Sequence, residues 1–157
     1  MAMIPKPHQV AETAPSRYPS TDEGFADLLG LPARSTLRLV AKIDEGFPYS
    51  VFDHFQRETG FPAATLAELI QVPVRTLHRR RAERRFSPEE SDRLLRAARV
   101  AFLARRLFEG HMAEARQWLA EPQPALGGAT PLAFSRTDVG AREVEALIGR
   151  LEHGVPS

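Results

Sequence analysis

Residues 65–85 read Thr-Leu-Ala-Glu-Leu-Ile-Gln-Val-Pro-Val-Arg-Thr-Leu-His-Arg-Arg-Arg-Ala-Glu-Arg-Arg, and this stretch decides the expected fold. A short segment with apolar residues at helical spacing leads directly into a strongly basic one, which is typical of the two helices of a helix-turn-helix. The second segment, residues 73–85, carries six arginines against one acid. Such a row of cations on an exposed helix is what contact with duplex phosphates requires, so the sequence indicates DNA as the first partner.

The predicted helix-turn-helix spans residues 62–85 and has a small apolar core of its own. Its expected buried residues are Leu66, Leu69, Ile70 and Leu77. Ala67 is small enough to let the two helices approach closely, and Pro73 suits the start of the second helix because its missing N–H would be unsatisfied there anyway. The motif often has glycine in its turn, where this chain has Gln71. Glutamine can be accommodated if that residue need not adopt a positive φ.

The exposed side of the second helix supplies the expected DNA contacts. Its N-terminal half would enter the major groove, where arginine can pair bidentately with guanine. The candidates for base edges and nearby phosphates are Arg75, Thr76, Arg79 and Arg80. Further along, Arg81, Arg84 and Arg85 are expected to contact phosphates, and His78 can face either way. The alternative is an ordinary surface helix with a solvated arginine face.

The charge distribution shows that this basic character is local. The 157 residues include 21 basic and 20 acidic side chains, so the chain has almost no net charge. Residues 48–110 carry 12 arginines against 8 acids, whereas residues 111–157 carry 4 basic against 6 acidic side chains. A positive middle followed by a mildly acidic end suggests two surfaces with two partners.

Composition predicts a soluble, cytoplasmic protein, and the succession of helix signals described below predicts an all-α fold. Hydrophobic residues make up 43% of the chain, enough for a core, and there is no cysteine for disulfide or thiolate chemistry. No apolar run approaches the roughly 20 residues that span a bilayer, so no membrane is expected. Residues 1–20 hold four prolines and no apolar core segment. We therefore expect a disordered arm there and no signal peptide.

Helix signals follow one another from residue 20 onward. Ser20 and Glu23 form a possible capping pair for a helix that Gly30 ends. The second helix is predicted over residues 36–44, and its apolar side would consist of Leu37, Val40, Ala41 and Ile43. A third covers residues 50–58. The longest runs from the capping box at Ser87 to about residue 108, as the spine of the core or part of a dimer interface.

The last 48 residues are expected to form a compact helical hairpin. Thr130 and Thr137 are placed as helix caps, and Gly127 with Gly128 predicts a turn of unusual φ. Trp118 is more often a core anchor than a ligand contact, since a large aromatic among alanines and leucines fills volume first.

Several of these short motifs together carry a resemblance. They are Arg75-Thr76-Leu77, Arg79-Arg80-Arg81, Phe86-Ser87, Glu90 to Leu94, Ala115, Trp118-Leu119, Leu126-Gly127-Gly128, Thr130-Pro131-Leu132, Thr137, Gly140, Val144 and Gly154. With them the chain resembles the Xre/MbcA/ParS-type antitoxins of type II toxin–antitoxin systems over nearly everything after residue 25. It departs from them in having Phe86 where leucine is usual, and in its very short tail after Gly154.

The resemblance implies an Xre/Cro-like helix-turn-helix domain for DNA binding and dimerisation, which we place at residues 21–109, and a helical toxin-binding domain at residues 110–157. It further implies a RES-domain toxin that consumes NAD, blocked at its active site, and repression of the shared operon through operator DNA. The positions carried over for toxin binding are Trp118, Leu126, Gly127, Pro131, Leu132, Thr137, Gly140, Val144, Leu147, Leu151, Gly154 and Ser157. Phe134 is a further candidate anchor.

An enzyme is the opposing hypothesis, and the sequence does not favour it. There is no glycine-rich phosphate loop, no histidine pair at metal-ligand spacing and no evident nucleophile with its base, so we expect no catalytic residue, metal or cofactor. A third hypothesis is a stand-alone dimeric repressor without a toxin partner. A homodimer is expected in either case, because such proteins read paired half-sites about 34 Å apart. A higher-order complex with toxin follows from the resemblance. Residues 25–60 and the long helix are the candidates for the dimer contact.

Overall fold

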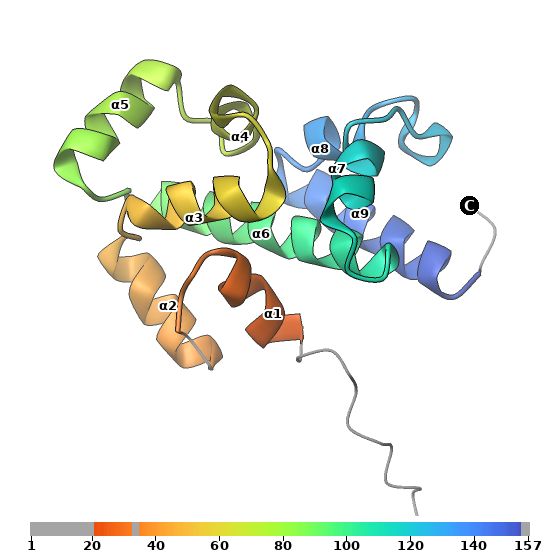
Figure 1. Ribbon diagram of the computed structural model, residues 1–157, viewed down its shortest axis with the longest axis horizontal. Helices are drawn as coiled ribbons and strands as arrows, with labels where there is room; N and C mark the ends of the chain where they lie inside the picture. The colour runs from red at the N-terminus through yellow and green to blue at the C-terminus, as the bar shows by residue number, and fades with distance from the viewer. Residues whose placement is uncertain (1–20, 33–34, 155–157) are drawn as a thin grey trace, which may run out of the picture.

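The computed structural model describes residues 21–32 and 35–154, which form an all-helical fold (Figure 1), as predicted. In chain order the elements are α1 Thr21–Leu28, α2 Thr36–Glu45, α3 Ser50–Thr59, α4 Ala63–Leu69, α5 Val74–Glu83, α6 Pro88–Leu107, α7 Met112–Leu119, the short 3-10 helix η1 Pro124–Leu126, α8 Pro131–Phe134 and α9 Asp138–Glu152. The predicted disordered arm, the Ser20 cap and Ser157 lie outside the described residues.

Helix α6 is the spine of the molecule, as its length predicted. The Ser87 hydroxyl accepts a hydrogen bond from the Glu90 backbone N–H and the Glu90 carboxylate accepts one from the Ser87 N–H, which is the predicted capping box. Figure 1 shows α6 crossing the molecule, with α5 toward one end and α7, α8 and α9 toward the other. Its buried residues include Leu94, Ala97, Ala98, Val100, Ala101 and Phe102.

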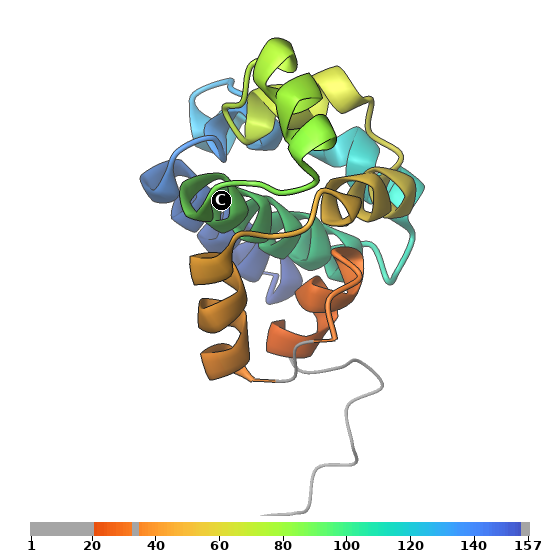
Figure 2. The same ribbon diagram turned by 90° about the vertical axis from the view of Figure 1, so that its left-hand side faces the viewer.

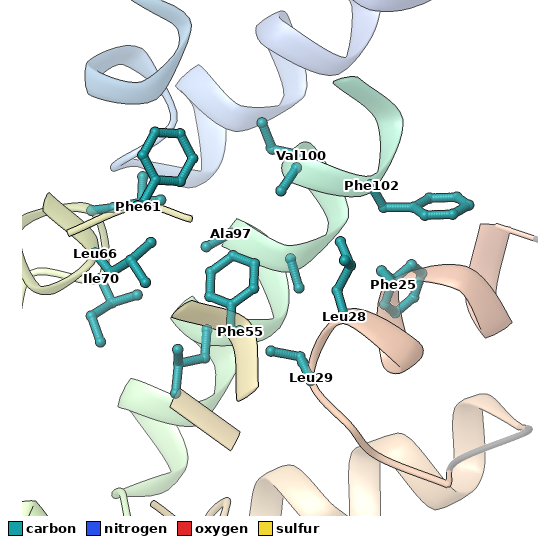
Figure 3. Packing of buried hydrophobic residues seen from close by; sticks show 14 of the residues in the cluster. Phe25, Leu28, Leu29, Phe55, Phe61, Leu66, Ile70, Ala97, Val100 and Phe102 are labelled. Atoms are coloured by element: carbon teal, nitrogen blue, oxygen red, sulfur yellow. The ribbon is translucent and has the colours of Figure 1, made fainter. Parts of the chain in front are cut away.

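One hydrophobic cluster surrounds this spine and joins the two halves of the chain. Phe25 and Leu28 of α1, Phe55 of α3 and Leu66 of α4 approach α6 in Figure 3. The same cluster contains Val144, Leu147 and Ile148 of α9 and Leu119 of α7. The helix-turn-helix and the C-terminal helices therefore share a core, and the expected boundary near residue 109 falls at the tight turn that follows α6.

Helix α2 corrects the sequence-based prediction of its buried side. Leu37 is 84% exposed, Val40 is 50% exposed and Ala41 is also exposed. The side chains turned toward the core are Leu39, which is buried, and Ile43, which is half-buried. These two are four residues apart and form the correct inward stripe. Helix α2 has a second apolar stripe, formed by Leu37, Val40 and Ala41. Because α2 lies at the periphery of the molecule (Figure 2), nothing in the described chain covers this stripe.

Three ion pairs fix the register of α9 along α6. Arg96 lies 3.8 Å from Asp138, Arg99 lies 2.6 Å from Glu145, and Arg106 lies 2.8 Å from Glu152. The three acids are seven residues apart, so they recur every two turns on the side of α9 that faces α6. Partly exposed pairs of this kind contribute little stability each, but together they specify how the C-terminal helix is aligned.

Candidate functional site

The turn between α4 and α5 contains a non-glycine residue in the left-handed region. Gln71 has a φ of 55°, so the condition under which glutamine fits this turn easily, a φ that is not positive, is not met. The Gln71 N–H donates to the Glu68 carbonyl and the Val72 N–H to the Ala67 carbonyl, which closes the end of α4. This closure requires the left-handed residue. The Gln71 side chain also donates to the Arg136 carbonyl, 3.3 Å away, in the C-terminal half.

Helix α5 presents a basic face to solvent. Leu77 is buried and anchors the inner side of the helix, as predicted. The exposed cationic or ionisable side chains, which we call the basic face, are Arg75, His78, Arg79, Arg81 and Arg84. Thr76 is half-buried beside them. Arg79 has an exposed Glu83 at 3.6 Å, a surface pair weak enough to be exchanged for a phosphate or a base edge.

Arg80, which the sequence placed among the DNA contacts, is half-buried and lies apart from this face. Its Nε donates to both oxygens of Glu90, at 2.7 and 3.0 Å, and its Nη1 donates to Glu83 at 3.0 Å. These hydrogen bonds, above all those to Glu90, raise the pKa of Arg80. Burial by itself would raise the pKa of Glu90, but hydrogen bonds from Arg80 and Ser87 outweigh it and lower that pKa below its usual value. The pair ties the recognition helix α5 to the start of α6.

The C-terminal end of α5 is held by its backbone and by Arg85. Arg84 has a φ of 62°, and its carbonyl accepts a hydrogen bond from the Tyr49 N–H at 3.0 Å. The guanidinium of Arg85 donates to the carbonyls of Glu45 and Gly46, at 3.2 and 2.7 Å. Those carbonyls are at the end of α2, so Arg85 caps that helix through Nη1 while its side chain stays exposed.

The predicted toxin-binding positions divide into two groups. Leu126, Pro131, Gly140, Val144 and Leu147 are buried in the chain's own core, so most of their side-chain surface is already used in folding. Leu132 and Trp118 are half-buried, and Trp118 packs against Phe108 with ring centroids 6.3 Å apart. The remaining described positions are exposed: Gly127, Thr137, Leu151 and Gly154.

Short polar side chains build the turn between α8 and α9. Thr130 caps α8 by accepting the Ala133 N–H at 3.1 Å, and Thr137 caps α9 by accepting the Gly140 N–H at 3.0 Å, as the sequence predicted. The buried Ser135 hydroxyl donates to the Pro131 carbonyl at 2.7 Å. Gly140 packs directly against the Phe134 carbonyl, where any Cβ would overlap that oxygen. The turn is therefore fixed by hydrogen bonds at α8 and at α9 and by the close contact between Gly140 and the Phe134 carbonyl.

Sequence reasoning missed an apolar groove beside this turn. It is lined by Ala133, Phe134, Thr137, Val139, Gly140 and Glu143. Val139 is 79% exposed although it lies in the first turn of α9. The available signal was a β-branched apolar residue directly after the polar helix start formed by Thr137 and Asp138. A second groove, between α4 and α8, is crossed by the Arg136–Glu68 ion pair at 3.7 Å.

In the described ranges 21–32 and 35–154, no group of three histidine, aspartate or glutamate side chains is placed to hold a metal ion. None of the helices in these ranges is both long and apolar enough to cross a membrane.

Comparison with known families matches both halves of the chain. The Antitoxin Xre-like helix-turn-helix domain matches residues 38–99, and the Antitoxin Xre/MbcA/ParS C-terminal toxin-binding domain matches residues 103–154. The junction between the two matches falls inside α6.

Curated relatives agree with this assignment. The chain is 41% identical over 128 residues to an antitoxin Xre of Yersinia enterocolitica, which covers 81% of this chain and 86% of the relative. It is 35% identical to an antitoxin Xre of Photorhabdus laumondii, over 82% of this chain and 88% of the relative. A third antitoxin Xre, of Pseudomonas putida, is 30% identical over 74% of this chain and 82% of the relative. With a helix-turn-helix that carries a basic recognition helix and a C-terminal domain of the toxin-binding type, the chain belongs to the Xre family of antitoxins.

Proposed function

We propose that this antitoxin neutralises a RES-domain toxin that degrades NAD, and that it binds operator DNA to repress its own operon. In this proposal the C-terminal domain covers the active site of the toxin while the basic face of α5 contacts the operator. The protein acts by binding and not by catalysis, since an inhibitor needs only a complementary surface with a few anchors. The observation that supports the proposal best is the junction of a solvent-facing cationic helix and a toxin-binding domain through the single helix α6.

The toxin half of the proposal is tested by coexpression with a RES-domain toxin, which the proposal expects to be encoded in the same operon. We expect growth to be restored and cellular NAD to be maintained, together with a stable complex of the two proteins. A catalytically inactive toxin is the control for toxicity. If the antitoxin binds DNA but neither binds the toxin nor protects NAD, the alternative holds, which is a stand-alone dimeric repressor.

Two arginines, Arg79 in α5 and Arg84 directly after it, allow contacts that read the base sequence to be distinguished from contacts with phosphates. We expect Arg79→Ala to weaken operator binding by about 1–3 kcal/mol, because a guanidinium that pairs with a base is lost. Arg84→Ala is expected to weaken binding to all duplexes alike and to reduce its salt dependence, since a phosphate contact carries no sequence information. Titrations of operator and random duplex at several salt concentrations measure both effects. Equal binding by the native protein and both variants would contradict the DNA proposal.

We further propose that the protein is a homodimer whose subunits meet through the uncovered stripe of α2, Leu37, Val40 and Ala41. Exposed apolar residues that lie side by side mark interaction surfaces, and paired operator half-sites require two recognition helices. Leu37→Lys is expected to give the mass of a single chain in analytical ultracentrifugation at micromolar concentration. Leu151→Lys, at an apolar residue of α9 that is 38% exposed, is the matched control and should leave the dimer intact. A dimer that survives Leu37→Lys places the symmetry axis elsewhere.

A further inference from the structure

Several predicted toxin contacts in the C-terminal domain are buried, which limits the surface on which a toxin could be anchored. Val144 and Leu147, which the sequence suggested as anchors, are almost inaccessible, at 0% and 2% exposed. Among the described residues of α7, α8 and α9, the large hydrophobic side chains that reach solvent most fully are Val139 at 79% and Leu151 at 38%. Protein interfaces depend on a few apolar anchors that become desolvated on binding. The anchor region is therefore to be sought beside one of these two residues.

Val139 differs from Leu151 because it stands beside a groove. The groove has a volume of about 420 Å³, and Phe134 at the end of α8 and Val139 at the start of α9 are its large apolar lining residues. Thr137, Gly140 and Glu143 also line it. We call this the α8–α9 groove. It offers an apolar side chain of a partner two large hydrophobic contacts and one neighbouring carboxylate.

The groove is also rigid before anything binds to it. The Thr137 hydroxyl caps α9, and the Ser135 hydroxyl donates a hydrogen bond to the Pro131 carbonyl of α8. Gly140 has no side chain, so the Phe134 carbonyl can approach α9 closely. A site that is already ordered loses little conformational entropy on binding, so more of the contact energy contributes to affinity. This distinguishes it from Leu151, which lies in the last turn of α9 and lines none of the described pockets.

The charge beside the groove indicates the chemistry of the partner. Glu143 pairs with Arg150 at 3.3 Å, and the two side chains are 47% and 35% exposed. Such an exposed pair contributes little, so a cation on a partner can replace Arg150. The C-terminal segment as a whole carries more acids than bases. The groove thus fits an apolar side chain that is accompanied by a basic one.

We propose that the α8–α9 groove is the anchor site for the toxin, with an apolar toxin side chain between Phe134 and Val139 and a basic toxin side chain on Glu143. This inference rests on the proposed neutralising function and names the part of the C-terminal domain that performs it. The groove belongs to the segment that matches the toxin-binding domain of the family, residues 103–154. The toxin is therefore the occupant favoured over a second copy of this chain, whose contact we place on α2.

The test uses the full-length antitoxin and a catalytically inactive RES-domain toxin in calorimetric titration. Val139→Lys should weaken toxin binding by on the order of 30-fold or more, as loss of an interface hot spot does. Val139→Ile should bind normally, and Leu151→Lys, on the same helix, should change affinity by less than about threefold. Because Val139 is so exposed, lysine there leaves the fold intact, which unchanged helical content and operator affinity would document.

The outcomes separate this inference from the proposed function. Toxin binding that is equal in Val139→Lys and the native protein, or that is lost in Leu151→Lys instead, overturns the groove while the neutralising function stands. A changed mass of the free Val139→Lys protein with unchanged toxin affinity assigns the groove to a second copy and also overturns it. A native antitoxin that does not bind the toxin overturns both proposals.

Discussion

Replacing Glu90 with glutamine is expected to lower the free energy of unfolding by on the order of 3 kcal/mol, the lower end of the range for breaking a buried ion pair. Glu90 is only 6% exposed, and Arg80 holds it through two hydrogen bonds from a single nitrogen. Glutamine has the same shape but no charge, so the half-buried guanidinium of Arg80 would lose its counter-ion. This loss of stability is smaller than for a fully buried pair, because 22% of the Arg80 side chain remains exposed to solvent.

Urea denaturation of Glu90→Gln against Glu89→Gln measures this effect. Glu89 precedes Glu90 in the first turn of α6 but is exposed, so the same change there should cost less than about 0.5 kcal/mol. A double variant, Arg80→Met with Glu90→Leu, is expected to recover most of the loss, since replacing both charges of a buried pair removes the uncompensated one. If the two glutamine variants unfold alike, the pair does not fix α5 to α6.

The same pair predicts how stability depends on pH. The pKa of Glu90 is lower in the folded protein than in the unfolded chain, where a glutamate titrates near about 4.3. The unfolded state therefore binds the proton first as the pH falls. The contribution of Glu90 is complete above the unfolded pKa and disappears as the pH falls through the folded one. The difference between the native protein and Glu90→Gln should be constant from about pH 6 to 8 and shrink below about pH 4.

A second large effect is expected at Gly140, where alanine should cost about 3 kcal/mol and disturb the α8–α9 turn. A methyl group at this position would overlap the carbonyl oxygen of Phe134 and crowd the hydroxyl of Thr137 at 3.0 Å. The obstacle is a backbone atom, so relief requires that α8 move away from α9. Overpacking of this kind typically costs 1–3 kcal/mol, and a rigid backbone contact belongs at the upper end, at about 3 kcal/mol.

Gly149→Ala, on the same helix, is the matched control with the opposite sign. No atom lies within 4 Å of a Cβ at Gly149. Alanine is favoured over glycine inside a helix by roughly 0.5–1 kcal/mol, so this variant should be more stable than the native protein. Thermal unfolding of the two variants gives the comparison. Two shifts of the same sign would show that the close approach of Phe134 to α9 does not constrain the fold.

The elements that the sequence predicted correctly are those set by neighbours along the chain. The capping box at Ser87 and the caps at Thr130 and Thr137 depend on residues three positions apart, and the structure contains all three. The buried residues of the helix-turn-helix follow in the same way, because Leu66, Leu69, Ile70 and Leu77 occupy the inward side of two adjacent helices. Local signals of this kind need no knowledge of the rest of the molecule.

The errors arose where a distant part of the chain decides the outcome. Arg80 has the same neighbours as the other arginines of α5, and only the packing of α6 brings Glu90 to it. On α2, two apolar stripes compete, and the position of α6 selects the one with Leu39. The conformation of Gln71, which the sequence left open, is left-handed because the hydrogen bonds that close the end of α4 require it. The sequence did not indicate Val139 as a contact residue, because its exposure depends on how α8 packs against α9.

The continuity of α6 has a consequence for the lifetime of the antitoxin in a cell. The segment that ends one matched domain and the segment that begins the next are turns of one helix, with no linker between them. Opening that helix exposes the common core, so neither half survives as a folded remnant. Under the proposed function, a protease that degrades the protein would end repression and release the toxin in a single event, and renewed transcription would begin as protection is lost.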